Sequence, residues 1–445
     1  MSERVDRIAL VNTEGGLEIA SRDGSERQLL AQGDRFFHFP AWSPDAARVA
    51  AIGGNRDRAG VFIFDRALDT AVDPGAEHTA YESGRNAPIY LYWSPSGEHI
   101  SFIATRADEQ SMGLHVANAN RAFMQSGKRS HLVATGRPCF WDWTPDGKKL
   151  LVHVGGWDGE RGAKLELVDP FAPAGMTKTK VARPGLFQSP GIAVSGLYRA
   201  FGHVSRKNEL QLIVDRMGDE EKSSRIALRH EGVAAMSWSP ASDQLAYISP
   251  PEQVRTYYGP LRLLDIITSD VRVLSDEIVL AFFWSPDGKR IAYFTVAQVS
   301  ETVRHMLPDP STIARDGGAQ PEMMSAEDID SEEFDTDEND DKDGKDDESE
   351  LWLNMWVVDV ETGNDRLVAT FEPIDVFVNQ FLPFFDQYAK SHRIWSPDSD
   401  ALVLPMMRPD GMGGKTAHIC VVPATPEEGR PHRIADGLMA FWSPR

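Results

Sequence analysis

One phrase, Trp-Ser-Pro-Asp-Gly followed by a short run of β-branched and aromatic residues, recurs along the chain and constrains its fold more than any other feature. Copies begin at Trp42, Trp93, Trp143, Trp238, Trp284, Trp395 and Trp442, and a degenerate copy is assigned to Gln188. The successive spacings are 51, 50, 45, 50, 46, 111 and 47 residues. Self-similarity at such a period indicates a repeat architecture.

Each repeat has the pattern of four short strands. In the copy at Trp284, Pro286 sets φ, Asp287 can hydrogen-bond the local backbone and Gly288 allows a positive φ, as a tight reversal requires. Alternating apolar residues predict strands at Val279–Trp284, Arg290–Thr295, Trp352–Val360 and Asp365–Ala369. Four strands with a period near 50 residues are typical of a β-propeller blade, which must stack on its neighbours to bury both faces.

The two ends of the sequence complement each other. The last copy has only its first strand, whereas three strands, Arg7–Val11, Gly16–Ala20 and Glu26–Leu30, precede the first Trp. We therefore expect one blade to combine both termini, so that the all-β chain, residues 1–445, forms a single eight-bladed β-propeller. Seven blades would result if the Gln188 copy formed no blade. A linear solenoid would instead need capping repeats at its ends.

The spacing of 111 residues contains a strongly acidic segment. Residues 327–350 include 15 Asp or Glu against two Lys, so they carry −13 of the net charge of −21. So few apolar residues cannot form a core, and we interpret residues 300–350 as a flexible acidic insertion within the sixth blade. Its expected role is to repel anions or to recruit a basic partner.

This insertion also contains oxygen ligands at the spacing of a calcium loop. Asn339, Asp341 and Asp343 precede Gly344, and Glu350 takes the twelfth position. Against calcium, the first ligand is Asn rather than Asp, and a run this rich in Asp matches such a pattern easily by chance. Calcium is the only cofactor that the sequence suggests.

At its Pro-Asp dipeptides the chain resembles the TolB-type propellers. Pro44-Asp45, Pro145-Asp146, Pro286-Asp287 and Pro397-Asp398 carry this resemblance, which also extends to the propeller domains of dipeptidyl-peptidases and tricorn-type proteases. The resemblance covers nearly the whole chain except the insertion. It implies a docking platform, or a substrate gate for a separate peptidase, because these families use their propellers in those ways.

Composition narrows the class of protein further. No apolar run approaches the roughly 18 residues that a membrane-spanning helix needs, and the N-terminal residues show no secretory pattern. Two distant cysteines favour a reducing compartment, so we expect a cytoplasmic protein. The negative charge argues against nucleic acid as a partner. We expect a monomer that binds a protein or peptide.

Four arginines occupy nearly equivalent places just before the first strand of successive blades. These are Arg35, Arg85, Arg137 and Arg183, whereas later blades have acidic residues at this place. Loops at this position converge on one mouth of the channel, where guanidinium groups could bind a carboxylate bidentately. The alternative is that each arginine caps a strand or pairs with a neighbouring carboxylate.

The segment before Trp395 is the longest aromatic-rich lead into any blade. It contains Phe384, Phe385, Tyr388 and His392, which we predict to bind an apolar ligand or partner near the channel. Core packing around the long insertion is the alternative interpretation.

Motifs of catalysis are missing from the sequence. There is no HExxH, no phosphate-binding loop and no GxSxG. We therefore predict a non-catalytic binding platform. The alternative is a hydrolase or lyase with a metal or acid/base site built from several blades at the channel.

Overall fold

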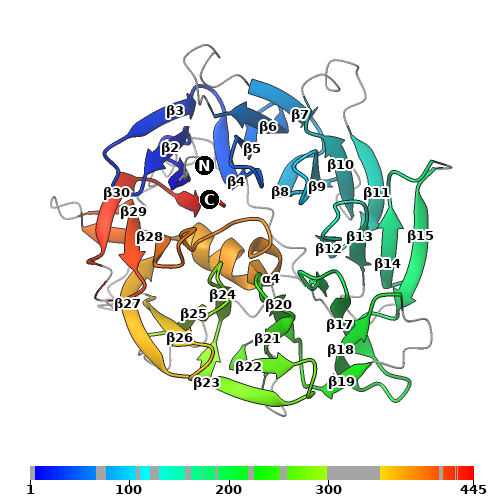
Figure 1. The fold of residues 1–445 in the computed structure, drawn as a ribbon. Coiled ribbons are helices and arrows are strands. Elements are labelled where there is room, and N and C mark those ends of the chain that lie inside the picture. The colour runs from blue at the N-terminus through cyan, green and yellow to red at the C-terminus, as the bar shows by residue number, and fades with distance from the viewer. Residues whose placement is uncertain are drawn as a thin grey trace, which may run out of the picture.

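The computed structural model shows a ring of antiparallel β-sheets around a central axis, the arrangement of a β-propeller (Figure 1). It describes residues 6–66, 77–106, 111–120, 130–155, 162–173, 175–185, 189–218, 225–250, 258–297, 351–409, 414–425, 427 and 429–444. Within these residues there are six four-stranded sheets and one seven-stranded sheet. In each four-stranded sheet the strands follow one another outward from the axis.

The first four sheets occupy the N-terminal half of the chain, with one strand added from the C-terminus. The first sheet consists of β31 (Met439–Trp442), β1 (Arg7–Val11), β2 (Leu17–Ser21) and β3 (Arg27–Ala31). The second consists of β4 (Phe36–Trp42), β5 (Arg48–Gly54), β6 (Ala59–Asp65) and β7 (Glu77–Ser83). The third consists of β8 (Pro88–Trp93), β9 (His99–Thr105), β10 (Met112–Asn118) and β11 (His131–Gly136). The fourth consists of β12 (Cys139–Trp143), β13 (Leu150–Val154), β14 (Lys164–Asp169) and β15 (Thr177–Ala182).

The remaining sheets complete the ring. The fifth consists of β16 (Gly191–Ile192), β17 (Tyr198–Val204), β18 (Leu210–Arg216) and β19 (Ile226–Arg229). The sixth consists of β20 (Ala235–Trp238), β21 (Gln244–Ile248), β22 (Gly259–Asp265) and β23 (Val271–Val279). The seven-stranded sheet consists of β24 (Ala281–Trp284), β25 (Arg290–Val296), β26 (Leu353–Asp359), β27 (Asp365–Pro373), β28 (Ala401–Pro409), β29 (Lys415–Pro423) and β30 (His432–Asp436).

The two ends of the chain share one sheet. β1 pairs antiparallel with β31, with Ile8 opposite Trp442 and Val11 opposite Met439. The strands of this sheet lie within one residue of the predicted ranges. Hydrogen bonds between the first and last strands replace a covalent connection and remove two open strand edges.

The seven-stranded sheet has two parts that meet through a short contact. β27 pairs with β28 only at Glu372 with Met407 and Pro373 with Met406. Beyond this contact, an isolated bridge joins Trp395 to Leu402 of β28. Because β27 continues to Pro373 to make its contact with β28, it extends four residues past its predicted end.

The repeated phrase forms the turn that connects the inner strand of a sheet to the next one. At Trp284, the Ser285 hydroxyl donates to Asp287 Oδ1 at 2.6 Å, and the Gly288 N–H donates to the Ser285 carbonyl at 2.9 Å. Gly288 has a φ of 70°, which favours glycine over other residues. Serine, aspartate and glycine each therefore have a local structural task in this turn.

The degenerate copy lies four residues later than the sequence assignment. The Gly196 N–H donates to the Ala193 carbonyl at 2.8 Å, and the Leu197 N–H donates to Ser195 Oγ at 3.1 Å. These bonds match those of Ser285, Asp287 and Gly288, so Ile192 takes the place of the tryptophan. Gln188 itself lies outside the described residues; the copy is displaced because Ser189-Pro190 matches the repeated phrase in sequence, whereas the turn requires the glycine at position 196.

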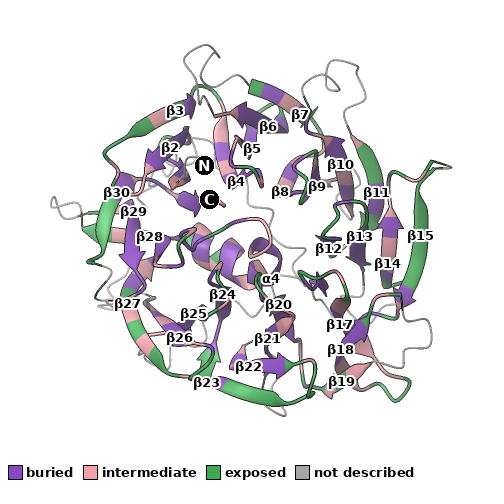
Figure 2. Cartoon of the chain, viewed as in Figure 1, coloured by how far each residue is buried: buried purple, intermediate pink, exposed green. Residues whose placement is uncertain are grey.

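Tryptophans of the repeat hydrogen-bond to the inner strand that precedes them around the ring. The indole N–H of Trp93 donates to the Ala41 carbonyl at 3.0 Å, and that of Trp395 donates to the Phe283 carbonyl at 2.9 Å. The Ala41 carbonyl belongs to the inner strand of the preceding sheet, and the Phe283 carbonyl belongs to β24, the inner strand of the seven-stranded sheet to which Trp395 is bridged. Burial follows the same radial order, because inner strands are buried and outer strands such as β15 and β23 are largely exposed (Figure 2).

The predicted acidic insertion lies between β25 and β26. All of residues 300–350, including the four predicted calcium ligands, lies outside the described residues.

Candidate functional site at the central channel

A segment of the chain itself crosses the middle of the ring. After β27, residues 374–394, here called the plug, form the π-helix η1 (Phe377–Phe381), the 3-10 helix η2 (Leu382–Phe384) and the short helix α4 (Phe385–Tyr388). Figure 1 shows this segment inside the ring, where α4 lies beside β24 and β20. The plug therefore occupies the place where many propellers have a channel.

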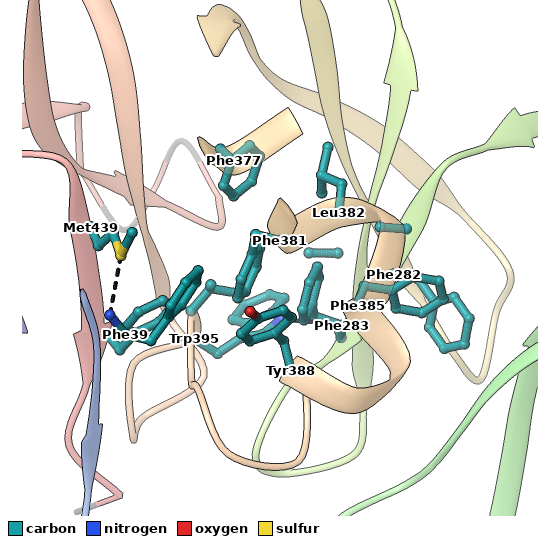
Figure 3. Close-up of a cluster of buried hydrophobic side chains, with 14 of the residues drawn as sticks. Phe39, Phe282, Phe283, Phe377, Phe381, Leu382, Phe385, Tyr388, Trp395 and Met439 are labelled. Atoms are coloured by element: carbon teal, nitrogen blue, oxygen red, sulfur yellow. Dashed lines mark hydrogen bonds between the residues drawn. The ribbon is translucent and has the colours of Figure 1, made fainter. Parts of the chain in front are cut away.

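The first part of the plug, residues 374–385, is its aromatic half. Phe381 stacks on Phe283 of β24 at 5.4 Å between ring centroids and lies 5.5 Å from Phe441 of β31. Phe385 contacts Phe282 at 4.9 Å. These rings, several of which appear in Figure 3, tie the plug to strands on two sides of the ring.

The second part, residues 386–394, is the polar half. The buried Gln387 side chain accepts the Trp141 N–H at 3.0 Å and donates to the Trp141 carbonyl at 3.0 Å. The same side chain accepts from Ser189 Oγ at 3.1 Å and donates to the Tyr90 hydroxyl at 3.2 Å. The Gln387 side chain thus pairs with the open inner edge of β12 as a neighbouring strand would, so it acts as a substitute strand. All of its donors and acceptors are used.

Three ionisable side chains meet beside Gln387. Lys390 Nζ lies 3.6 Å from Asp142 Oδ2 and donates to Ser189 Oγ at 3.0 Å and to the Pro190 carbonyl. Asp142 also accepts from the Tyr92 hydroxyl at 3.2 Å and from the Ile192 N–H at 2.9 Å. These groups come from the inner strands β8 and β12, from β16 and the residues just before it, and from the plug.

Burial controls the protonation of this group. It raises the pKa of Asp142, and it raises the pKa of Asp386 to about 6, although Lys390 opposes the shift of both carboxyls. Burial also lowers the pKa of Lys390, against the attraction of the two aspartates. The Ser189 N–H donates to Asp386 at 3.1 Å, which helps to hold its carboxylate.

His392 ends a second chain of hydrogen bonds in the polar half. Its Nε2 lies 3.1 Å from the Phe39 carbonyl, so Nε2 carries the proton, and Nδ1 accepts from Ser391 Oγ at 2.6 Å. Ser391 Oγ lies 2.7 Å from the Tyr90 hydroxyl. Burial lowers the pKa of His392 to about 4, so the imidazole is neutral near pH 7.

The predicted aromatic residues therefore come together in the plug. Phe385, Tyr388 and His392 are buried there, and Phe384 is half-buried 6.4 Å from Phe140. Tyr388 contacts Phe39 at 4.9 Å and Tyr90 at 5.0 Å, which are internal packing contacts. Ligand binding by these four residues stays a prediction.

The four predicted arginines lie before the inner strands β4, β8, β12 and β16, and they differ in their surroundings. Arg35 forms an ion pair with Glu77 at 2.6 Å and lies 4.4 Å over the Phe62 ring. Arg137 is half-buried. Arg85 and Arg183 are exposed, and within the described part of the chain neither has an ion pair.

The sequence did not point to the ionisable residues of the plug or to Asp142 of β12, which meets them. Asp142 stands between Trp141 and Trp143 on a wholly buried strand, and an acidic residue in such a setting is a recognisable signal. Asp386 and Lys390 are four residues apart, which places them on one face of a helical turn. Within the described ranges, no group of three or more His, Cys, Asp or Glu side chains could hold a metal ion.

Comparisons with known proteins concern the fold. The sequence matches no protein-family model, and no curated protein matches it. TolB from Acinetobacter baumannii is 17% identical with a TM-score of 0.37, over 60% of this chain and 62% of that chain, which is less than two thirds of its length.

Two further solved structures are similar over more of the chain. The β-propeller domain of the Trilobed protease from Pyrococcus furiosus is 10% identical with a TM-score of 0.47, over 91% of this chain and 99% of that one. Oligogalacturonate lyase from Vibrio parahaemolyticus is 9% identical with a TM-score of 0.44, over 97% and 85%. TolB and a protease propeller are among the kinds of protein that the Pro-Asp repeats resemble. In the described part of the chain, no helix has the length and apolar character needed to span a membrane.

Proposed function

We propose that this chain is a non-catalytic, TolB-like β-propeller with eight blades that serves as a platform for a protein or peptide partner. In this proposal the seven-stranded sheet comprises two blades, because Trp395 bridges to β28 as the inner strand of a further blade would. The blade that combines both termini closes the ring.

The occupied channel carries this proposal. A ligand or substrate deep inside the ring would need the space that the plug fills with Phe381, Phe385 and Tyr388. The plug's buried charges already have partners, so they are engaged in holding the plug. Binding is then left to the faces of the ring, where side chains are exposed.

The mouth that bears the predicted arginines is the face we favour. Arg85 and Arg183 are exposed at equivalent places on two sheets, without an ion pair in the described residues. Guanidinium groups bind carboxylates bidentately, so an acidic partner segment fits this mouth. Arg35 and Arg137 would support it from less exposed positions.

Location and metal content remain part of the proposal. Cys139 and Cys420 are both free and buried, and burial raises the pKa of the Cys139 thiol to about 12. Unreactive free thiols suit a reducing compartment, and we place the protein in the cytoplasm.

The segment 300–350 remains our candidate for an acidic insertion in the sixth blade, with Asn339, Asp341, Asp343 and Glu350 as candidate calcium ligands.

Affinity capture with the full chain tests this function. We expect the double variant Arg85→Glu and Arg183→Glu to lose a partner that the wild-type chain retains from an extract, as measured by quantitative mass spectrometry. A purified partner should then bind the variant at least roughly tenfold more weakly, since charge-assisted hydrogen bonds are lost.

The control carries the same charge change on the opposite face. Lys148 and Lys289 lie in the turns of the repeated phrase, at the far end of the inner strands. Lys148→Glu with Lys289→Glu should leave the partner bound. Equal retention of the partner by both double variants would contradict the proposed binding face.

A further inference from the structure

Arg393 lies at the opposite end of the channel from the predicted arginines. Its carbonyl accepts the N–H of Trp442 at 2.8 Å, so it is level with the last residue of β31. The predicted arginines, in contrast, precede the first residues of the inner strands. Arg393 is exposed although it follows the buried His392 and precedes the buried Ile394.

Arg393 is exposed to solvent, yet desolvation by the surrounding protein lowers the pKa of its guanidinium, as expected for a side chain at the mouth of a channel. Its backbone contacts the inner edge of the ring, and three more strands separate this edge from the outer surface of the first sheet. Tyr92 acts electrostatically on the Arg393 guanidinium, and Tyr92 is itself only half-buried. The polar half of the plug, with half-buried Lys390 and Ser391, forms the inner limit of this region.

Charges in this region are unequally partnered. Lys390 has Asp142, Ser189 and Pro190 as partners, and Asp386 is held by the Ser189 N–H and the charge of Lys390. Arg393 differs from both, because its guanidinium has neither a hydrogen bond nor an ion pair to any residue that the structure describes. A guanidinium has five N–H donors, and the described residues supply an acceptor to none of those of Arg393.

We propose that Arg393, with Tyr92 beside it, forms a binding site for a single oxyanion at this mouth of the channel. A carboxylate or a phosphate group matches the planar pair of donors of a guanidinium and would give Arg393 the counter-charge that it lacks. The plug closes the inner side of the site, so a small anion or the carboxylate end of a peptide fits, whereas a chain passing through the ring does not.

This site is independent of the proposed platform. The arginines of that platform and Arg393 lie at opposite ends of the inner strands, so variants at one mouth leave the other intact. Loss of anion binding would not affect capture of a partner at the arginine-bearing mouth, and the reverse also holds.

Titration of the full chain tests the site with three probes. Inorganic phosphate, acetate, and a short peptide compared in its free-acid and amidated forms would be titrated by calorimetry at low ionic strength. We expect saturable binding of at least one oxyanion, weakened roughly tenfold or more in Arg393→Ala. Arg393→Lys should bind with intermediate affinity because it keeps the charge and loses the bidentate geometry.

Controls separate the site from general charge effects. Arg216→Ala removes an exposed arginine at the end of β18, outside both proposed sites, and should bind the anions like the wild-type chain. If Arg393→Ala fails to fold, Arg393→Gln retains a polar side chain and serves in its place. Preference for the free-acid peptide would identify a peptide end as ligand, and preference for phosphate a small anion. Unsaturable binding, or equal affinity in Arg393→Gln and the wild-type chain, would overturn the proposal.

Discussion

The aromatic and polar halves of the plug occupy the same channel by different physical means. In the aromatic half, Phe377, Phe381 and Phe385 are buried among one another's rings and those of β24 and β25, at centroid distances of 4.9 to 6.0 Å. In the polar half, Gln387 and Lys390 instead use directed hydrogen bonds and ion pairs to β12 and to the residues before β16. The aromatic half contributes apolar burial, and the polar half contributes hydrogen bonds and ion pairs that require a defined position of the segment.

This difference teaches how one segment can be both firmly held and uniquely placed. Apolar burial is roughly proportional to area and tolerates small shifts of a ring. Hydrogen bonds do not tolerate such shifts, because a buried donor without its acceptor costs about 1 to 3 kcal/mol. We infer that the aromatic half provides most of the stability of the plug and that the polar half selects its position.

The largest effect is expected from removing a ring of the aromatic half. Phe381→Ala should lower the free energy of unfolding by about 3 to 5 kcal/mol, because it leaves a cavity between Phe283, Phe377 and Phe441. Chemical denaturation monitored by tryptophan fluorescence measures this loss. Phe384→Ala, at a half-buried position of the same segment, is the control and should cost clearly less. Equal losses would show that the aromatic half is not the anchor.

A smaller but more local effect is expected in the polar half. Gln387→Leu leaves the Trp141 N–H and carbonyl without partners, which should cost about 2 to 4 kcal/mol. Hydrogen exchange should show faster exchange of the Trp141 amide than of amides on β13. Gln380→Leu, which removes one hydrogen bond to Tyr388, is the matched control. Unchanged protection of Trp141 in the Gln387 variant would contradict the role of Gln387 as a substitute strand.

The regular part of the molecule could be predicted from sequence because its determinants are local and repeated. Turns built from Ser285, Asp287 and Gly288 recur with the same residue types, so the all-β fold and most strand positions followed from them. Where the repeat degenerates, prediction was displaced by four residues to Gln188. Ile192 packs like the tryptophan but lacks its sequence signature, and only the turn glycine marks the position.

From the sequence, the plug could be recognised only as a segment of unusual composition. Its aromatic content set residues 376–395 apart, but nothing in the sequence indicates that Gln387 meets Trp141, which is 246 residues away. Contacts across a ring depend on its closure and diameter, which are global properties. The partners of Lys390 were missed for the same reason, because Asp142 comes from a strand on another blade.

The smallest effect is a pH dependence that only the polar half should show. Burial raises the pKa of Asp386 to about 6, so the folded protein holds this proton more tightly than the unfolded chain. The stabilisation is complete below the ordinary pKa of Asp and is lost as pH rises through about 6. Asp386→Asn should therefore flatten the stability profile between pH 4 and 6, and by linkage it should raise stability at pH 7 by up to about 3 kcal/mol.

Comparison with the aromatic half gives this experiment its control. Asp375 is exposed near the start of the plug, and Asp375→Asn should leave the slope of the profile as in the wild-type chain. Burial also raises the pKa of Asp142, so part of the pH dependence should remain in the Asp386 variant. Lys390 still has Asp142 as its ion-pair partner in that variant. Denaturant unfolding at several pH values measures all three chains. An unchanged slope in Asp386→Asn would mean that Asp386 does not couple the plug to pH, and that the position of the plug depends on Gln387 and Lys390 instead.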